Sequence, residues 1–362
     1  MPSVNLNPAG PALFNTEDVV GKWIIEQCIS PAIPPLYRVH RKDDPDTIGQ
    51  MQIWPLKPHN VDRLRREARI LRDLDHPAIP RLIDFGQSGA LQAVWIVTDF
   101  FDGDPVSDLL MQGPLDWKEA CVIALQIAEC MRHMHSHGIV HHDVNPNKVI
   151  VDPDKKARLV GFEMAMSDLE LARAARVDLG VLSYVAPEVL NDPEHLGERA
   201  DLYALGVVFY ELLTSRPAFP AALIEDELVA AHQMLEWKTH AEPLDPGDEV
   251  PSWLGNLIRK ATHPEPEQRL PDMDAFVGWL EAAEAAFAEA KAVATAAAPP
   301  PIAMNLAPTI KAPEPSIRVE APLAPPPTPP IVVYISSLIV GCVAGLAFSL
   351  LIILFAEVVG FG

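Results

Sequence analysis

Two short stretches of the sequence decide its fold. Residues 141–148 read His-His-Asp-Val-Asn-Pro-Asn-Lys, and residues 161–163 read Gly-Phe-Glu. The first stretch contains a carboxylate, Asp143, and ends in an ammonium, Lys148, whereas the second begins with Gly161, which has no side chain. Because magnesium is bound through oxygen ligands, neither Lys148 nor Gly161 offers a side-chain ligand to it.

The two stretches resemble the catalytic loop H-R-D-L-x-x-x-N and the D-F-G motif of protein kinases. The resemblance implies an α+β, bilobal kinase-like fold, with Asp143 at the position of the catalytic base. Lys148 then stands for the metal-binding Asn, and Gly161 for the metal-binding Asp. A kinase holds magnesium on the nucleotide to neutralise charge on the transferring phosphoryl group, which an ammonium or a hydrogen atom cannot do.

Further motifs of the same family follow in the large lobe, expected over residues 102–288. Residues 186–188 match A-P-E, and Asp201 begins a D-x-x-x-x-G pattern. The resemblance implies that Asp201 ties down the catalytic loop and that Arg269 pairs with the A-P-E glutamate. A buried pair of this kind costs about 3–5 kcal/mol to break. The residues in the family's structural positions are Glu67, His141, Phe162, Glu188, Asp201 and Arg269.

The small lobe, expected over residues 19–98, departs further from the family. Residues 26–37 replace the G-x-G-x-x-G loop with a stretch that has prolines and no glycine, so a phosphate cradle would lack its N–H donors. Trp54 stands where the phosphate-pairing Lys belongs. Glu67 keeps the ion-pair position of the C helix without that Lys. Glu67 is either the remaining partner of a Lys–Glu ion pair that acts as a switch, or a carboxylate on the helix face that pairs with a neighbouring Arg.

The hinge of the resemblance is formed by Thr98, Asp99, Phe100 and Phe101, whose main chain would face the adenine if a nucleotide binds. The histidines between residues 133 and 142 match no standard zinc spacing, so no metal site is predicted. The positions at which the family's chemistry is altered are Trp54, Asn145, Lys148, Gly161 and Glu163.

The scaffold positions are kept and the nucleotide and metal positions are changed. The sequence therefore favours a catalytically inactive pseudokinase that acts as a signalling or scaffolding module for an unknown protein partner, without a cofactor. The first alternative is an active serine/threonine kinase using ATP and Mg²⁺, in which Glu163 or Asp168 recruits the metal and Arg38 or Lys42 reaches the phosphates. The second is a non-catalytic nucleotide sensor.

Composition narrows the class of protein. The chain has 362 residues, with 28 Lys and Arg against 49 Asp and Glu, which gives a net charge of −21. Such a surface repels phosphate backbones, so nucleic-acid binding is not expected. The four cysteines form no C-x-x-C pattern, which is typical of reduced cytoplasmic thiols. The N-terminus has no basic and apolar signal-peptide pattern.

The C-terminal part predicts a membrane tether. The sequence predicts an N-terminal tail over residues 1–18 and the kinase-like domain over residues 19–288. An Ala-rich helix over about 274–298 is expected to close this domain. Residues 289–330 are rich in Pro and Ala and predict an extended linker. Residues 331–356 carry no charge and are long enough to span a bilayer, followed by a short tail, 357–362. Lys311 and Arg318 favour a cytoplasmic domain on the inner membrane. Gly341 and Gly345 suggest a homodimer contact. This layout resembles that of bacterial kinases with one membrane span.

Overall fold

The computed structural model describes residues 14–32, 34–167, 182–191, 197–219 and 227–282. Contacts divide the chain into Met1–Ala298 and Pro299–Gly362, and every described residue belongs to the first unit. No helix in the described ranges is both long and apolar enough to cross a membrane. The predicted linker, transmembrane helix and C-terminal tail lie outside the described residues.

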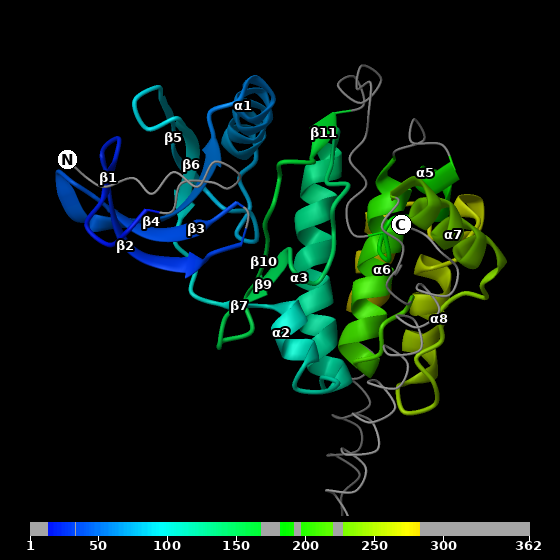
Figure 1. Ribbon diagram of the computed structural model, residues 1–362. Helices are drawn as coiled ribbons and strands as arrows, with labels where there is room; N and C mark the ends of the chain where they lie inside the picture. Colours follow the sequence, from blue (N-terminus) through cyan, green and yellow to red (C-terminus); the bar gives the residue numbers. More distant parts are fainter. Residues whose placement is uncertain (1–13, 33, 168–181, 192–196, 220–226, 283–362) are drawn as a thin grey trace, which may run out of the picture. The chain divides into compact units, whose positions relative to one another are not determined.

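The small lobe is an antiparallel sheet with one helix. In the described part of the chain, six strands are ordered β1-β2-β3-β4-β6-β5 (Figure 1). Their bounds are β1 Val19–Val20, β2 Trp23–Ser30, β3 Leu36–Arg41, β4 Asp44–Pro55, β5 Leu82–Ser88 and β6 Ala93–Asp99. Side chains alternate along β3, as the strand period of two requires. Tyr37 and Val39 are fully buried, whereas Arg38 and His40 lie on the other face.

Helix α1 (Pro58–Asp73) links the sheet to the cleft. Pro58 begins it, where the missing N–H costs nothing, and Leu64, Ala68 and Leu71 form its buried stripe. The helix ends at Asp73, before the segment of residues 75–77. This position places Glu67 on the buried side of the helix.

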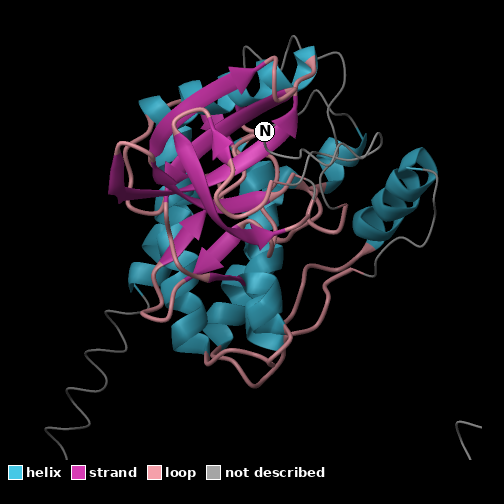
Figure 2. Ribbon diagram, turned by 60° about the vertical axis from the view of Figure 1, so that its left-hand side comes forward, coloured by secondary structure: helices cyan, strands magenta, loops and turns pink. Residues whose placement is uncertain are grey.

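The large lobe is mainly helical and lies beside the strands (Figure 2). Its long helices are α3 (Trp117–Ser136) and α6 (Glu198–Thr214), which pack together. The side chain of Asp116 caps α3 by accepting from the N–H of Lys118 at 3.0 Å. The other elements are α2 Val106–Leu110, α5 Pro187–Asn191, α7 Glu227–His240, α8 Ser252–Ala261, a helix over 273–282, the 3₁₀ turn Pro266–Gln268, and strands β7 Asp104–Pro105, β8 Ile139–Val140, β9 Val149–Val151, β10 Ala157–Leu159 and β11 Met166–Ser167.

The boundary predicted at the N-terminus is wrong by several residues. Phe14 is buried in the small-lobe core, and its N–H donates to the Tyr37 hydroxyl at 3.1 Å. The N–H of Glu17 donates to the carbonyl of Ile25 at 2.8 Å. Residues 14–18 therefore belong to the lobe rather than to a tail. The short stretch holds a single large apolar residue, too few to show a period.

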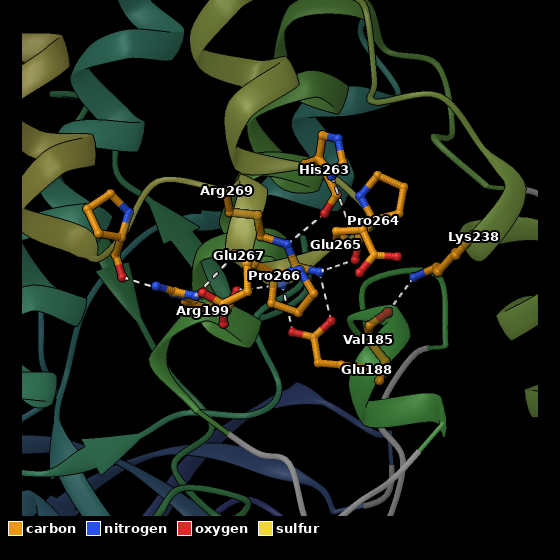
Figure 3. A network of polar contacts seen from close by, with 11 residues as sticks. Val185, Glu188, Arg199, Lys238, His263, Pro264, Glu265, Pro266, Glu267 and Arg269 are labelled. Carbon is orange, nitrogen blue, oxygen red and sulfur yellow. Dashed lines mark hydrogen bonds and ion pairs between the residues drawn. The ribbon is translucent and has the colours of Figure 1, made fainter.

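A buried ion pair holds the large lobe together below the cleft. The Arg269 guanidinium donates to both carboxylate oxygens of Glu188, at 2.6 and 2.7 Å, which is the pairing that the resemblance implies (Figure 3). It also donates to the carbonyls of His263, Pro264 and Arg199. With its side chain fully buried, Arg269 has its donors well matched, which a buried guanidinium needs.

Candidate functional site

The loop of residues 141–148 is held from below by Asp201, near the start of α6. One carboxylate oxygen of Asp201 accepts the backbone N–H of His141 at 2.8 Å, and the other accepts that of His142 at 2.9 Å. The imidazole of His135 contacts the same carboxylate at 3.0 Å. Burial raises the pKa of Asp201, but the hydrogen bond and positive field of His135 outweigh it, and the pKa falls to about 2. The anchor is therefore ionised.

His141 and Phe162 connect the two stretches that define the site. Their rings meet edge to face with centroids 5.1 Å apart, and both side chains are buried. Burial lowers the pKa of His141 to about 4, so the ring is neutral at pH 7. Nδ1 of His141 accepts the N–H of Asp143 at 3.3 Å. The neutral ring thereby fixes the backbone of the residue at the catalytic-base position.

The carboxylate of Asp143 is occupied by neighbours within the loop. Nδ2 of Asn145 donates to Oδ1 of Asp143 at 2.8 Å, and Nζ of Lys148 lies 3.5 Å from Oδ2. The Asn145 side chain also accepts the N–H of Asn147, at 3.0 Å. Asn145, which replaces a phosphate-holding Lys in the resemblance, thus serves to hold Asp143.

Lys148 fills the room between the two altered motifs. Its Nζ lies 2.6 Å from Oε1 of Glu163 and is largely buried. Burial alone would lower the pKa of Lys148, but the carboxylates of Glu163 and Asp143 raise it above its ordinary value. Gly161 has φ +84°, and a Cβ there would lie 2.6 Å from Cδ and Nζ of Lys148. The Lys148 side chain therefore fits only because residue 161 is a glycine.

These residues do not fit a magnesium ion. The ammonium at 148 carries the wrong charge for a ligand, and Gly161 has no ligand atom. Glu163, considered as a substitute ligand, already pairs with Lys148 through Oε1. Asp168, the other substitute, lies outside the described residues. Within the described residues, no group of three or more His, Cys, Asp and Glu side chains is arranged to hold a metal ion.

Trp54 and Glu67 occupy the positions at which the kinase resemblance places a lysine and its glutamate partner. Trp54 lies on β4, and the Arg63 guanidinium is 5.8 Å from the centre of its ring. Nε1 of Trp54 and Oε2 of Glu67 are buried and make no hydrogen bond among the described residues. Arg66 donates to the carbonyl of Glu163 at 3.2 Å. Burial is the main cause that raises the pKa of Glu67, whereas the charges of Lys148, Arg63 and Arg66 lower it, so the pairing of Glu67 with a neighbouring Arg stays a prediction.

The aromatic rings of the hinge make cation–aromatic contacts with two arginines. Arg38 pairs with Glu26 at 2.8 Å, and its guanidinium lies 4.4 Å from the centre of the Phe100 ring. Arg158 lies 4.6 Å from the centre of the Phe101 ring and pairs with Asp99 at 2.8 Å. Arg38, a candidate phosphate ligand in the active-kinase alternative, is therefore engaged at the hinge. Of the other hinge and phosphate candidates, Thr98 is buried, and Lys42 makes a backbone contact to Lys22.

Sequence reasoning missed Lys238, a buried lysine on α7. Its Nζ donates to the carbonyls of Leu182, Ser183 and Val185, just before the A-P-E motif. Figure 3 shows the contact with Val185. It also lies 4.7 Å from the Phe219 ring centre and 5.1 Å from that of Tyr203. Burial lowers the pKa of Lys238, but three carbonyl acceptors match the three donors of an ammonium. A lone lysine on a helix gave no sequence signal of this role.

The contact between residues 148 and 161 can be measured with a double-mutant cycle. In the wild-type background, Gly161→Ala should cost at least about 1 kcal/mol more than in a Lys148→Asn background, because the shorter side chain removes the overlap. The strain of the left-handed backbone is common to both and cancels. Urea unfolding gives the free energies, and Gly89→Ala, whose Cβ would meet nothing within 4 Å, is the control. Equal costs in the two backgrounds would contradict the contact.

The buried Glu67 should make stability depend on pH. Burial, and then repulsion by Glu163, raises its pKa from 4.5 to about 8. Between these values the folded protein binds more protons than the unfolded chain, so stability falls as pH rises through this window. Glu67→Gln should remove that fall, with a gap from wild type that grows by at most about 1.4 kcal/mol per pH unit. Urea unfolding from pH 5 to 9 measures it.

The control for this series is Glu281→Gln, a change at an exposed carboxylate that should keep the wild-type profile. If wild type and Glu67→Gln have parallel profiles across the whole range, Glu67 does not titrate in the folded protein as described.

Comparison with known proteins agrees with this geometry. Residues 50–278 match the family described as protein kinase domain. Among curated proteins, the chain is 33% identical over 170 residues to serine/threonine-protein kinase pkn2 of Myxococcus xanthus, covering 45% of this chain and 20% of that protein. It is 32% identical over 224 residues to serine/threonine-protein kinase PrkC of Bacillus subtilis, covering 60% and 33%. It is 33% identical over 210 residues to serine/threonine-protein kinase PknD of Mycobacterium tuberculosis, covering 57% and 31%.

The chain spans a third or less of the length of these three relatives. The family match covers more than half of the chain and includes both stretches from which the site is built. The chain therefore belongs to the protein kinase family, and its kinase-like domain is similar to those of bacterial serine/threonine kinases.

Proposed function

We propose that the protein is a pseudokinase that binds a protein partner through a kept kinase scaffold and transfers no phosphate. The observation that carries this proposal is the position of Lys148. Its ammonium lies between the carboxylates of Asp143 and Glu163, in the room that a side chain at Gly161 would need. A positive charge fixed there by the chain itself takes the place of an exchangeable cation.

The physical argument concerns charge. Phosphoryl transfer depends on positive groups that neutralise the phosphates in a site with little water. Here Trp54 replaces the lysine on β4, the turn after β2 has no glycine, and Arg38 is held at Phe100. Lys148 is itself neutralised by two carboxylates. Magnesium and nucleotide are thus not cofactors in this proposal.

The scaffold supports a binding role because contacts within the chain order its backbone. Asp201 fixes the loop of residues 141–148, Arg269 fixes Glu188, and Lys238 fixes the backbone just before it. A surface whose backbone is already ordered loses less entropy when a partner binds. The partner in this proposal is a protein.

One observation favours an active kinase as a second candidate. Asp143 is kept at the catalytic-base position, and the relatives named above are called serine/threonine-protein kinases. In that case Lys148 would supply positive charge near the reacting groups. A nucleotide sensor without chemistry is a weaker variant of the same idea, since Arg38 and Arg158 already cover the two hinge rings.

Phosphoryl transfer decides between the first two candidates. We expect the purified full chain to incorporate no more label from Mg-ATP or Mn-ATP than its Asp143→Asn variant, because no metal is held beside Asp143. Autophosphorylation with radiolabelled ATP is the measurement. Incorporation that disappears in Asp143→Asn would overturn the pseudokinase proposal and establish the active kinase.

The thermal stability of the protein with and without ATP distinguishes the nucleotide sensor from the pseudokinase and from the active kinase. A ligand that binds only the folded state adds about 2.7 kcal/mol at a hundred times its Kd. No shift at millimolar ATP supports the pseudokinase, whereas a shift that does not need metal would establish the sensor.

We further propose that residues 331–356 tether the protein to a membrane, with the linker of residues 289–330 as a spacer. The support is the uncharged sequence of that stretch. Deleting Ile331 onward should move the protein from the membrane fraction to the soluble fraction on cell fractionation. Deletion of residues 299–310, which leaves the apolar stretch intact, is the matched control and should stay on the membrane. A truncated protein that still sediments with membranes would refute the single tether.

A further inference from the structure

A mostly apolar groove lies on the large lobe, away from the site described above. Its volume is about 180 Å³. The rings of Trp117 on α3 and Trp253 on α8 meet edge to face in it, with centroids 6.1 Å apart. Val122 is 47% exposed beside them. The residues that line the groove are Trp117, Lys118, Cys121, Val122, Leu125, Trp253 and Leu280.

The groove and the catalytic loop lie at opposite ends of α3. Trp117 is the first residue of this 20-residue helix, and the loop around Asp143 follows its last turn. At about 1.5 Å per residue, the two ends are roughly 30 Å apart. A segment bound in the groove would therefore leave the loop uncovered.

The chain itself supplies a segment next to this groove. The described residues end at 282, directly after Leu280, which lines the groove and belongs to the helix over 273–282. The buried positions of this helix, at spacings of three and four residues, are Met273, Phe276, Val277 and Leu280. Continued at helical period, the same face would next present Glu284 and then Phe287, because positions four and seven residues apart share a face.

Charge also favours this segment. Lys118 lines the groove, and its Nζ lies 5.3 Å from the centre of the Trp117 ring. Glu284 precedes Phe287 by less than one helical turn, so a carboxylate and an aromatic ring arrive together. Phe287 is also the first large apolar residue after Leu280. An apolar groove with a cation at its edge is complementary to such a pair.

We propose that residues 283–298 dock in this groove, with Phe287 against Trp117 and Trp253 and Glu284 towards Lys118. The docked segment lies at the end of α3 that is remote from Asp143, so it leaves the catalytic-loop face uncovered.

The native cysteines provide the test. Cys121 lines the groove and is half-buried, Cys28 is exposed on β2, and Cys130 is fully buried in α3. The purified full chain is treated with iodoacetamide, and the labelling rate of each cysteine is followed by peptide mass spectrometry. Phe287→Asp should raise the rate at Cys121 by about tenfold, since a buried aromatic ring is lost from the groove. The rate at Cys28 should not change.

Cys130 is the control for folding, because labelling of this buried thiol would show that the variant has unfolded. If Phe287→Asp unfolds, a charge reversal tests the same contact. Glu284→Lys should raise the rate at Cys121, and Lys118→Glu combined with Glu284→Lys should restore protection. The conservative Phe287→Leu should stay close to wild type.

Two results would overturn the proposal. The first is a Cys121 rate that is the same in wild type, in Phe287→Asp and in Glu284→Lys. The second is protection of Cys121 in the wild type that is lost on dilution, because it would mean that a second copy of the chain covers the groove.

Discussion

The ammonium group of Lys148 is the charge on which the cleft depends. The carboxyl groups of Asp143, Glu163 and Glu67 converge around it, and two unit charges 4 Å apart interact by about 4 kcal/mol at the effective dielectric of a protein surface. Without this cation the carboxylates would repel one another in a buried space. The loop of residues 141–148 and the turn at Gly161 therefore keep their positions through a contact that is internal to the chain.

In the large lobe, other buried polar side chains hold the backbone in a similar way. Asp201 accepts backbone N–H groups, while Lys238 and Arg269 donate to backbone carbonyls. In each case one buried side chain orders a stretch of irregular backbone through several hydrogen bonds. Such groups are expensive to bury and are stable only when every donor and acceptor is satisfied. Removing one partner of such a contact would leave the other buried and unpaired, which is strongly destabilising.

Much of this could be predicted from the sequence, because motifs fix the order of elements in a known scaffold. The bilobal fold, the strand that carries Trp54, the Glu188–Arg269 pair and the contact of Asp201 with the loop are all implied by the resemblance to kinase motifs. The position of Lys148 could not be predicted. It depends on the β9–β10 hairpin, which brings residue 148 beside residues 161 and 163. Phe14 and Lys238 were missed for the same reason, since their partners are distant in sequence.

The contact between Lys148 and Gly161 also has an evolutionary consequence. An acidic side chain regained at position 161 would find an ammonium where the metal ion has to bind. An asparagine regained at position 148 would leave Glu163 and Asp143 without their cation, and the site would still lack its second ligand. Neither single step gives a functional metal site for selection to keep. Under the proposed function, a metal site would therefore need coordinated changes at both positions, 148 and 161.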